Sequence, residues 1–155
     1  MTLTSSTFID GASIPPLYTC DGKNISPPLL ISGVPAQAKS LVLIMDDPDV
    51  PKAVKPDGVF DHWALFNIAP ATTTIAEGGS VGTRGNNGAG RLGYTGPCPP
   101  AQYEPSEHRY NFVLYALDGE LALKEGASKQ EVLQAIEGHV LEEVQLMGRY
   151  KRVAQ

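Results

Sequence analysis

The sequence lacks the features that mark nucleic-acid-binding and membrane proteins. Its 12 lysines and arginines are outnumbered by 17 acidic residues, for a net charge of −5, and only the last few basic residues cluster. Without a basic stripe there is no electrostatic footprint for a nucleic acid or an anionic membrane. Apolar runs such as Leu41–Met45 are too short to span a bilayer, and Met1–Asp10 has neither the basic region nor the apolar stretch of a signal peptide. We therefore expect no nucleic-acid partner, no membrane span, and a cytoplasmic protein or one whose leader has been removed.

Cysteine is also scarce, because Cys20 and Cys98 are the only two in the chain. They form no CxxC pair, and no third or fourth thiol could complete a structural zinc site. Two reduced thiols are the favoured interpretation for a cytoplasmic protein. A disulfide between the N-terminal segment and the loop at Cys98 is the alternative. The sequence leaves it open because it does not give the distance between the two residues.

Glycine and proline are abundant instead, with 16 and 13 residues in a chain of 155. A helical bundle tolerates few of them, whereas a turn-rich β protein makes use of them. A chain of this length suits one domain, and no linker or internal repeat divides it. The composition therefore predicts a single domain over residues 1–155 that consists mainly of β-strands.

Several apolar segments have the length and composition of strands. They are 29–31, 41–45, 62–68 and 109–117, with shorter candidates at 8–10 and 72–75. The run 41–45 is continuously apolar, which is typical of a strand buried on both faces. A short helix is predicted after Ser128, which forms a capping-box pattern with Glu131, and Gly138 is suited to end it. Residues 139–150 fit either a helix or a strand, so the sum is a mostly β, sandwich-like domain with one short helix.

Unusual residues gather at the ends of these predicted strands. The acidic turn Asp46–Pro51 follows the buried strand, and one of its X–Pro bonds, such as Val50–Pro51, is a candidate for the cis form. His62 begins one strand and His108 precedes another, although a lone histidine is more often structural than functional. The Gly/Pro-rich segment 93–100 lies between them, and its glycines would let backbone N–H groups approach a ligand.

Four motifs in this order resemble the phosphatidylethanolamine-binding protein family, which includes the Raf kinase inhibitor protein and plant flowering-time regulators. They are D-P-D-x-P at Asp47–Pro51, the pair His62-Trp63, G-Y-x-G-P-C-P-P at Gly93–Pro100 and H-R-Y at His108–Tyr110. Two further segments, 18–22 and 138–150, are similar to the short bacterial and archaeal branch of that family. Each motif is weak alone, whereas the set is specific and covers nearly the whole chain.

The resemblance implies an antiparallel β-sandwich with a Greek-key core and one or two short helices, and it makes residues 139–150 a late strand. It also implies a small pocket at one end of the sheets that accepts phosphate, sulfate, acetate or a phosphoethanolamine head group. The ligand-binding residues that it implies are Asp47, His62, Gly96, Cys98, Pro99, Pro100, His108 and Tyr110. The segment 101–107 departs from the family pattern and would narrow the pocket or change what it accepts, and the long C-terminal helix of the animal proteins is missing.

The resulting hypothesis is a non-catalytic module, without a cofactor, that binds a phosphoryl or carboxylate group. His62 and His108 would donate N–H bonds, more strongly when protonated, while backbone amides near Gly96–Cys98 and the Tyr110 hydroxyl would add donors. Asp47 would accept a bond from a pocket histidine or face an ammonium group on the ligand. Affinity should weaken as pH rises through the histidine pKa values.

Three other interpretations stay open. A small hydrolase would use His62 and His108 with Cys98 or Asp47 as the nucleophilic or basic group. A metal site would combine Asp47, His62 and His108 with Asp49, although no ligand-pair motif supports it. A structural dimer with a vestigial pocket is the third. The resemblance also points to a protein kinase or protease as an inhibited partner, and to a homodimer, since the bacterial branch often dimerises.

Overall fold

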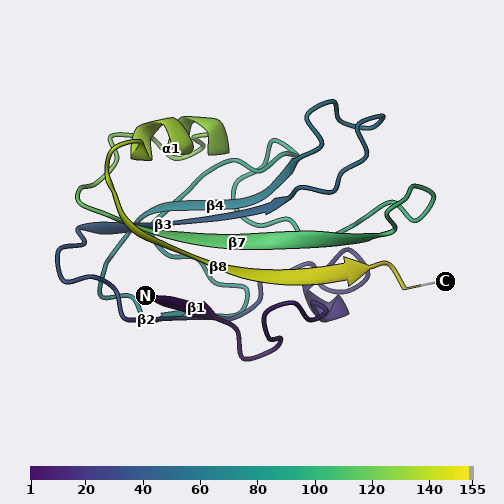
Figure 1. Ribbon diagram of the computed structural model, residues 1–155, viewed down its shortest axis with the longest axis horizontal. Helices are drawn as coiled ribbons and strands as arrows, with labels where there is room; N and C mark the ends of the chain where they lie inside the picture. Colours follow the sequence, from purple (N-terminus) through teal and green to yellow (C-terminus); the bar gives the residue numbers. More distant parts are fainter. Residues whose placement is uncertain (154–155) are drawn as a thin grey trace.

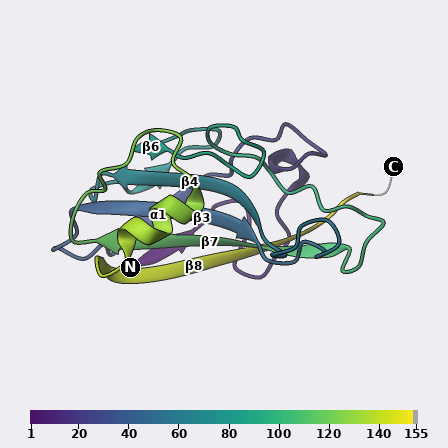
Figure 2. The ribbon, with the colours of Figure 1, turned by 90° about the horizontal axis from the view of Figure 1, so that it is seen from above.

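Two antiparallel β-sheets and one helix form three layers in the computed structural model, which describes residues 1–153 (Figure 1). The five-stranded sheet has the order β6-β4-β3-β7-β8, and the three-stranded sheet has the order β1-β2-β5. The helix α1 lies on the face of the large sheet that the small sheet does not cover (Figures 1 and 2). The elements are β1 Thr2–Thr4, the 3-10 helix η1 Pro16–Tyr18, β2 Leu29–Ser32, β3 Ser40–Asp47, β4 Phe60–Ile68, β5 Thr74–Ile75, β6 Thr83–Arg84, β7 Glu107–Leu117, α1 Lys129–Ile136 and β8 Val140–Lys151.

The chain passes between the two sheets several times. After β4 it enters the small sheet as β5, which pairs with β2, and then returns to the large sheet as β6, beside β4. The next strand, β7, pairs with β3 rather than with its predecessor. Such crossings are typical of Greek-key sandwiches. The predicted fold class, a mainly β antiparallel sandwich with little helix, is confirmed.

The strand β3 is the centre of the molecule, because β4 and β7 pair with it on its two sides. Its alternate side chains face opposite ways, as in any strand. Leu41, Leu43 and Met45 pack between the two sheets, whereas Val42 and Ile44 pack under α1. All five are buried, so the continuous apolar run that the sequence shows here serves two cores at once.

The helix α1 begins with the predicted capping box. The backbone amide of Glu131 donates to the Ser128 hydroxyl oxygen (3.2 Å), and the Ser128 amide donates to the Glu131 carboxylate (2.7 Å). Gly138 follows the helix with a φ of 78°, a conformation that glycine adopts without strain. Within residues 1–153, no helix is long and apolar enough to cross a membrane.

The structure corrects one of the sequence-based strand assignments and resolves another. The first strand is Thr2–Thr4 and not 8–10, because the segment around Phe8 runs into a turn beside β8. There Gly11 donates a backbone bond to Met147, and the amide of Met147 donates to the Asp10 carboxylate, so a side chain takes the place of a strand ladder. Residues 140–151 form the strand β8, as the family resemblance implied and as the period alone left open.

The two cysteines form a disulfide, so the favoured interpretation as reduced thiols is wrong. Their Cα atoms lie 5.4 Å apart, within the range that a disulfide requires. Neighbouring bonds bring the two loops together, because Cys20 donates its amide to the Pro97 carbonyl and the Tyr94 hydroxyl donates to the Tyr18 carbonyl. The sequence leaves open whether an X–Pro bond of the acidic turn is cis, and the cis peptide bond found within residues 1–153 lies instead at Glu104–Pro105.

Candidate functional site

A cavity of about 320 Å³ opens at the end of the large sheet where β3 ends and β4 and β7 begin. We call it the histidine cavity. Figure 1 shows the loop between β3 and β4, the loop before β7 and η1 at this same end of the molecule. The residues that line the cavity are Asp47, Val50, Val54, Phe60, His62, Thr95, Gly96, Cys98, Pro99, Pro100 and His108. Every predicted site residue except Tyr110 lies in its wall.

Strand order explains why residues far apart in sequence meet here. β3 lies between β4 and β7, so its last residue, Asp47, pairs with Phe60 at the start of β4, and the preceding Asp46 pairs with Asn111 in the first half of β7. His62 is two residues after Phe60 on β4, and side chains two apart on a strand share a face. His108 is the second residue of β7. The fold thus brings one carboxylate and two imidazoles to a single wall.

Asp47 and His108 form a buried pair. His108 donates Nδ1–H to Asp47 Oδ2 at 2.6 Å, and the side chains are 1% and 5% exposed, respectively. The other carboxylate oxygen accepts the amide of Asp49 at 2.8 Å. Asp47 therefore has the predicted role of accepting a bond from a pocket histidine, which fixes the tautomer of that ring. His108 Nε2 is buried and has no hydrogen-bond partner among residues 1–153.

His62 is held in a different way. Its Nδ1 lies 2.7 Å from the Thr95 carbonyl oxygen, to which it donates, and its ring meets Phe60 edge-on at 4.8 Å. Burial lowers the pKa of His62 from 6.5, and this effect outweighs the raising influence of the Thr95 bond and of the Asp47 charge. His62 is therefore mainly neutral at pH 7, with an acceptor lone pair on Nε2.

Tyr110 lies behind the wall rather than in it. Its ring stacks against His108 at 6.5 Å and meets His62 edge-on at 5.2 Å, and it is fully buried. Its hydroxyl has no hydrogen-bond partner within residues 1–153, and burial raises its pKa above the usual value. We infer that the Tyr110 ring packs against the two imidazole rings from behind the cavity wall and holds them in position.

The opposite wall is the segment 94–100. The amide of Gly96 donates to Asn24 Oδ1 at 2.7 Å, so it is not free for a ligand, and the expectation of an anion-binding amide at this position is wrong. A side chain at Gly96 would overlap the Tyr18 carbonyl oxygen, so this position requires glycine. Asn24 was missed from the sequence, because nothing in the loop 18–28 indicates which distant amide it serves.

The loop between β3 and β4 supplies an apolar edge that the sequence analysis also missed. Val50, Val54 and Phe60 line the cavity on this side. Phe60 could have been found from its spacing to His62, whereas the valines depend on how the loop folds. Asp49 does not line the cavity, because its carboxylate accepts two side-chain hydrogen bonds from Arg109, of 2.9 and 2.7 Å. The Arg109 bonds also hold the pKa of Asp49 below its usual value.

These contacts limit the chemistry of the site. Cys98 is bonded to Cys20, so the thiolate that a Cys–His hydrolase needs is not present in this form. Among residues 1–153, neither lysine nor arginine lines the cavity, which leaves the two imidazoles as its cationic groups when protonated. In the described part of the chain, three or more His, Cys, Asp or Glu side chains do not gather in a way that could hold a metal ion.

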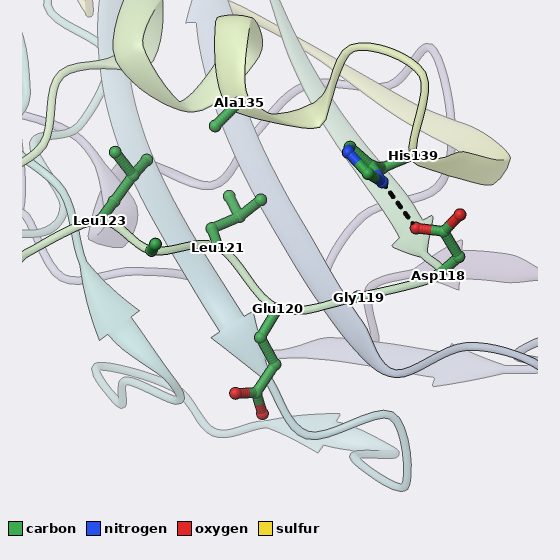
Figure 3. Close-up of a pocket in the computed structure, with 8 residues that line it drawn as sticks. Asp118, Gly119, Glu120, Leu121, Leu123, Ala135 and His139 are labelled. Carbon is green, nitrogen blue, oxygen red and sulfur yellow. Dashed lines mark hydrogen bonds and ion pairs between the residues drawn. The ribbon is translucent and has the colours of Figure 1, made fainter.

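The third histidine lies in a different place. His139 is half-exposed and pairs with Asp118 at 2.8 Å, beside a cavity of about 440 Å³ (Figure 3). Asp118 directly follows the end of β7, and His139 directly precedes β8, whereas His108 is near the start of β7. His139 is therefore remote from the histidine cavity along the long strands.

Comparison with known proteins gives a consistent result. A model of the phosphatidylethanolamine-binding protein family matches residues 4–151. A UPF0098 protein from Chlamydia trachomatis is 46% identical over 98% of this chain and 99% of its own length, and one from Methanothermobacter thermautotrophicus is 51% identical with the same coverage.

Solved structures agree in fold. The crystal structure of a putative phosphatidylethanolamine-binding protein homolog from Chlamydia trachomatis superposes with a TM-score of 0.92, at 46% identity and 97% coverage of both chains. YbcL from E. coli, described as a member of the mammalian family, has a TM-score of 0.86 at 24% identity over 98% of both chains. The chain therefore belongs to the phosphatidylethanolamine-binding protein family.

Proposed function

We propose that this protein is a non-catalytic binding module that holds a small anion, a phosphoryl or carboxylate group, in the histidine cavity. The observation that supports this most strongly is His108 Nε2, a buried polar atom without a partner in the wall of a cavity. Buried polar atoms are nearly always paired, so an unpaired one beside an open space indicates a missing ligand or water.

The direction of the hydrogen bonds determines how an anion would be held. Each imidazole already donates its Nδ1–H to a protein oxygen, Asp47 for His108 and Thr95 for His62. In the neutral rings, Nε2 is an acceptor and would repel an anion. A protonated ring turns Nε2 into a charge-assisted donor, so anion binding at His62, whose pKa burial lowers, is accompanied by proton uptake. The Asp47 carboxylate would balance the charge on a protonated His108.

The remaining walls determine what the anion can carry. Val50, Val54, Phe60 and the Pro99–Pro100 pair are apolar and surround the polar wall. The volume of about 320 Å³ is at the lower end of the range for small-molecule sites. A compact anion with a short organic group, such as phosphoethanolamine, fits both features.

Calorimetric titration of sulfate and of phosphoethanolamine, at about pH 6 where unperturbed histidine titrates, tests the proposal. Saturable binding is expected for the wild-type protein. His108→Ala and His62→Ala should each weaken it by roughly tenfold or more, as for a lost hydrogen bond to a charged group. His139→Ala is the matched control and should bind normally. Absence of binding to the wild-type protein, or normal binding by both cavity variants, contradicts the proposal.

A turnover assay distinguishes the proposed binding module from the hydrolase alternative. We expect no cleavage of aryl esters or phosphoesters by the wild-type protein beyond the rate shown by His62→Ala. A rate that disappears in this variant would make the protein an enzyme. Inhibition of a protein kinase or protease, assembly as a homodimer and a cytoplasmic location remain predictions, to be checked by inhibition assays, light scattering and cell fractionation.

A further inference from the structure

We propose that the Cys20–Cys98 disulfide is a redox modification site that controls the histidine cavity, an inference that rests on the anion binding proposed above. Cys98 lines the cavity, and both cysteines are exposed to solvent. The same bond is therefore part of the cavity wall and accessible to a reductant. An exposed disulfide is more readily attacked by a thiolate than one sealed in a core.

The wall beyond Pro97 depends on this bond for its position. Hydrogen bonds anchor the preceding stretch, where Gly96 donates to Asn24 and Cys20 donates to the Pro97 carbonyl. In residues 98–106, by contrast, the hydrogen bonds found within the described chain join members of this segment to one another. The disulfide is thus the bond that ties the segment 98–106 to the rest of the protein before β7 begins at Glu107.

The sequence explains why hydrogen bonds do not hold this segment. Pro99, Pro100 and Pro105 have no backbone N–H to donate. Within the segment 98–106, residues 101–105 are exposed and Pro99 is the one buried residue. Packing of one proline is a weak restraint compared with a covalent bond. Cleavage of the disulfide therefore frees the segment that carries Cys98, Pro99 and Pro100, three residues of the cavity wall.

The proposed reaction is thiol–disulfide exchange with a dithiol reductant, either a small molecule or a protein. A thiolate of the reductant attacks a sulfur of one of the two exposed cysteines, the S–S bond breaks, and a mixed disulfide forms. The second thiolate of the reductant then displaces the protein sulfur. Two electrons pass from the dithiol to the protein, and the dithiol leaves as its own disulfide. Its two protons end on the thiols of Cys20 and Cys98.

Reduction should weaken anion binding but not abolish it, because the histidines that would bind the anion are unchanged. Only molecules whose wall is in place would bind, so the apparent Kd rises in inverse proportion to their fraction. If about a tenth of the reduced molecules keep the wall in place, the Kd rises about tenfold. The oxidised protein is then the binding form, and the reduced protein is the weakened one.

The test compares sulfate titrations of the oxidised protein and of the protein reduced with dithiothreitol, with free thiols counted in each sample. Cys20→Ser removes the bond while leaving the cavity residue Cys98 unchanged. This variant should bind sulfate like the reduced protein, and dithiothreitol should not change its affinity. His139→Ala keeps the disulfide and should respond to reduction as the wild type does. Chymotrypsin should cleave at Tyr103, in the exposed part of the segment, faster after reduction.

The outcomes separate this inference from the proposed function. If the oxidised protein binds sulfate and reduction weakens binding about tenfold, as expected from population loss, the inference is supported. Equal binding by both forms overturns the inference and leaves the proposed function intact. Failure of the oxidised protein to bind overturns both. Global unfolding on reduction, seen by circular dichroism, also overturns it, because the bond would then be a general structural link.

Discussion

The side chain of His62 is subject to two opposing demands. Burial favours the neutral ring, which is why its pKa is lowered, whereas an anion at Nε2 requires the charged ring. The unfolded chain takes up a proton near pH 6.5, while the folded protein does so only at lower pH. His62 thus contributes stability above about pH 6.5 that is lost as pH falls through the folded pKa, because the unfolded state then binds more protons.

A bound anion should reverse part of this loss. We predict that sulfate, whose charge is constant over this range, raises the Tm more at about pH 5.5 than at about pH 7.5, because protonated histidine donates to it. Differential scanning fluorimetry at several pH values measures the effect. His62→Phe should reduce the pH dependence of the gain. A gain that is the same at both pH values would show that the imidazolium does not take part.

Gly96 and Gly148 are among the glycines that are fixed by close contacts rather than by turns. A Cβ at Gly96 would overlap the Tyr18 carbonyl oxygen, and one at Gly148 would overlap the side chain of Ile14. We predict that Gly148→Ala lowers stability by about 1–3 kcal/mol with sulfate binding retained, as for other overpacked sites. Gly96→Ala should in addition weaken binding, because it displaces the cavity wall.

Gly119→Ala is the control for both, since no other heavy atom of the described residues lies within 4 Å of a Cβ there. Urea denaturation gives the stabilities, and calorimetry gives the binding. Equal stability of Gly148→Ala and Gly119→Ala would mean that the segment around Ile14 moves aside at little cost.

The identities of most cavity residues could be obtained from the sequence, but their connections could not. Asp47 and His108 belong to motifs that the family resemblance identifies, and the structure joins them in one pair. Asn24 and Val54 lie in loops whose path depends on the whole fold. The expectation for the Gly96 amide failed for the same reason, since its partner comes from a loop distant in sequence.

At the scale of elements, α1 is the best-predicted part because its signal is local. The capping box is satisfied at both of its bonds, so its loss should be measurable. We predict that Ser128→Ala costs about 0.5–2 kcal/mol of stability, the range for loss of a helix N-cap. Thermal and urea denaturation check this. Ser6→Ala, at an exposed serine outside the helices and strands, should change stability much less.

A second bond network ties α1 to the large sheet. Lys129 Nζ lies 2.6 Å from Asp46 and 3.2 Å from Asp61, each of which neighbours a cavity residue in sequence. Burial alone would lower the pKa of Lys129, but the two carboxylates outweigh it and raise the pKa. The single positive charge of Lys129 is thus shared between two carboxylates close to the histidine cavity.

Strands were predicted well where the apolar pattern is strong, and poorly where contacts with other segments of the chain determine the local structure. The runs that became β3, β4 and β7 are long and apolar. By contrast, β8 is exposed over its first residues and fully buried at alternate positions only near its end, so its apolar sequence pattern is short and fits a helix as well as a strand. The segment 8–10 has a strand-like composition, but it lies where the Asp10 side chain meets the edge of β8.

At the scale of the whole molecule, stability depends on the two cores that share β3. Leu43 is fully buried between the sheets, whereas Leu30 is 43% exposed on the outer face of the small sheet. We predict that Leu43→Ala lowers the free energy of unfolding by about 2–5 kcal/mol, from lost apolar burial and the cavity left behind. Leu30→Ala should cost less than about 1 kcal/mol.

Urea denaturation of the oxidised proteins measures this difference. Similar losses in the two variants would contradict the arrangement in which β3 is the shared layer. Because both cores meet at this strand, Leu43→Ala should also weaken the attachment of α1, which loss of far-UV ellipticity at lower urea would reveal.

The pairing of β3 also has a consequence for protein synthesis. Its first neighbour, β4, follows it closely in the chain, but its second neighbour, β7, begins only at Glu107. While the chain is still growing on the ribosome, the most apolar strand therefore has one open edge for much of translation. An unpaired edge of this kind is a template for aggregation, so nascent chains should depend on chaperones until β7 has been made.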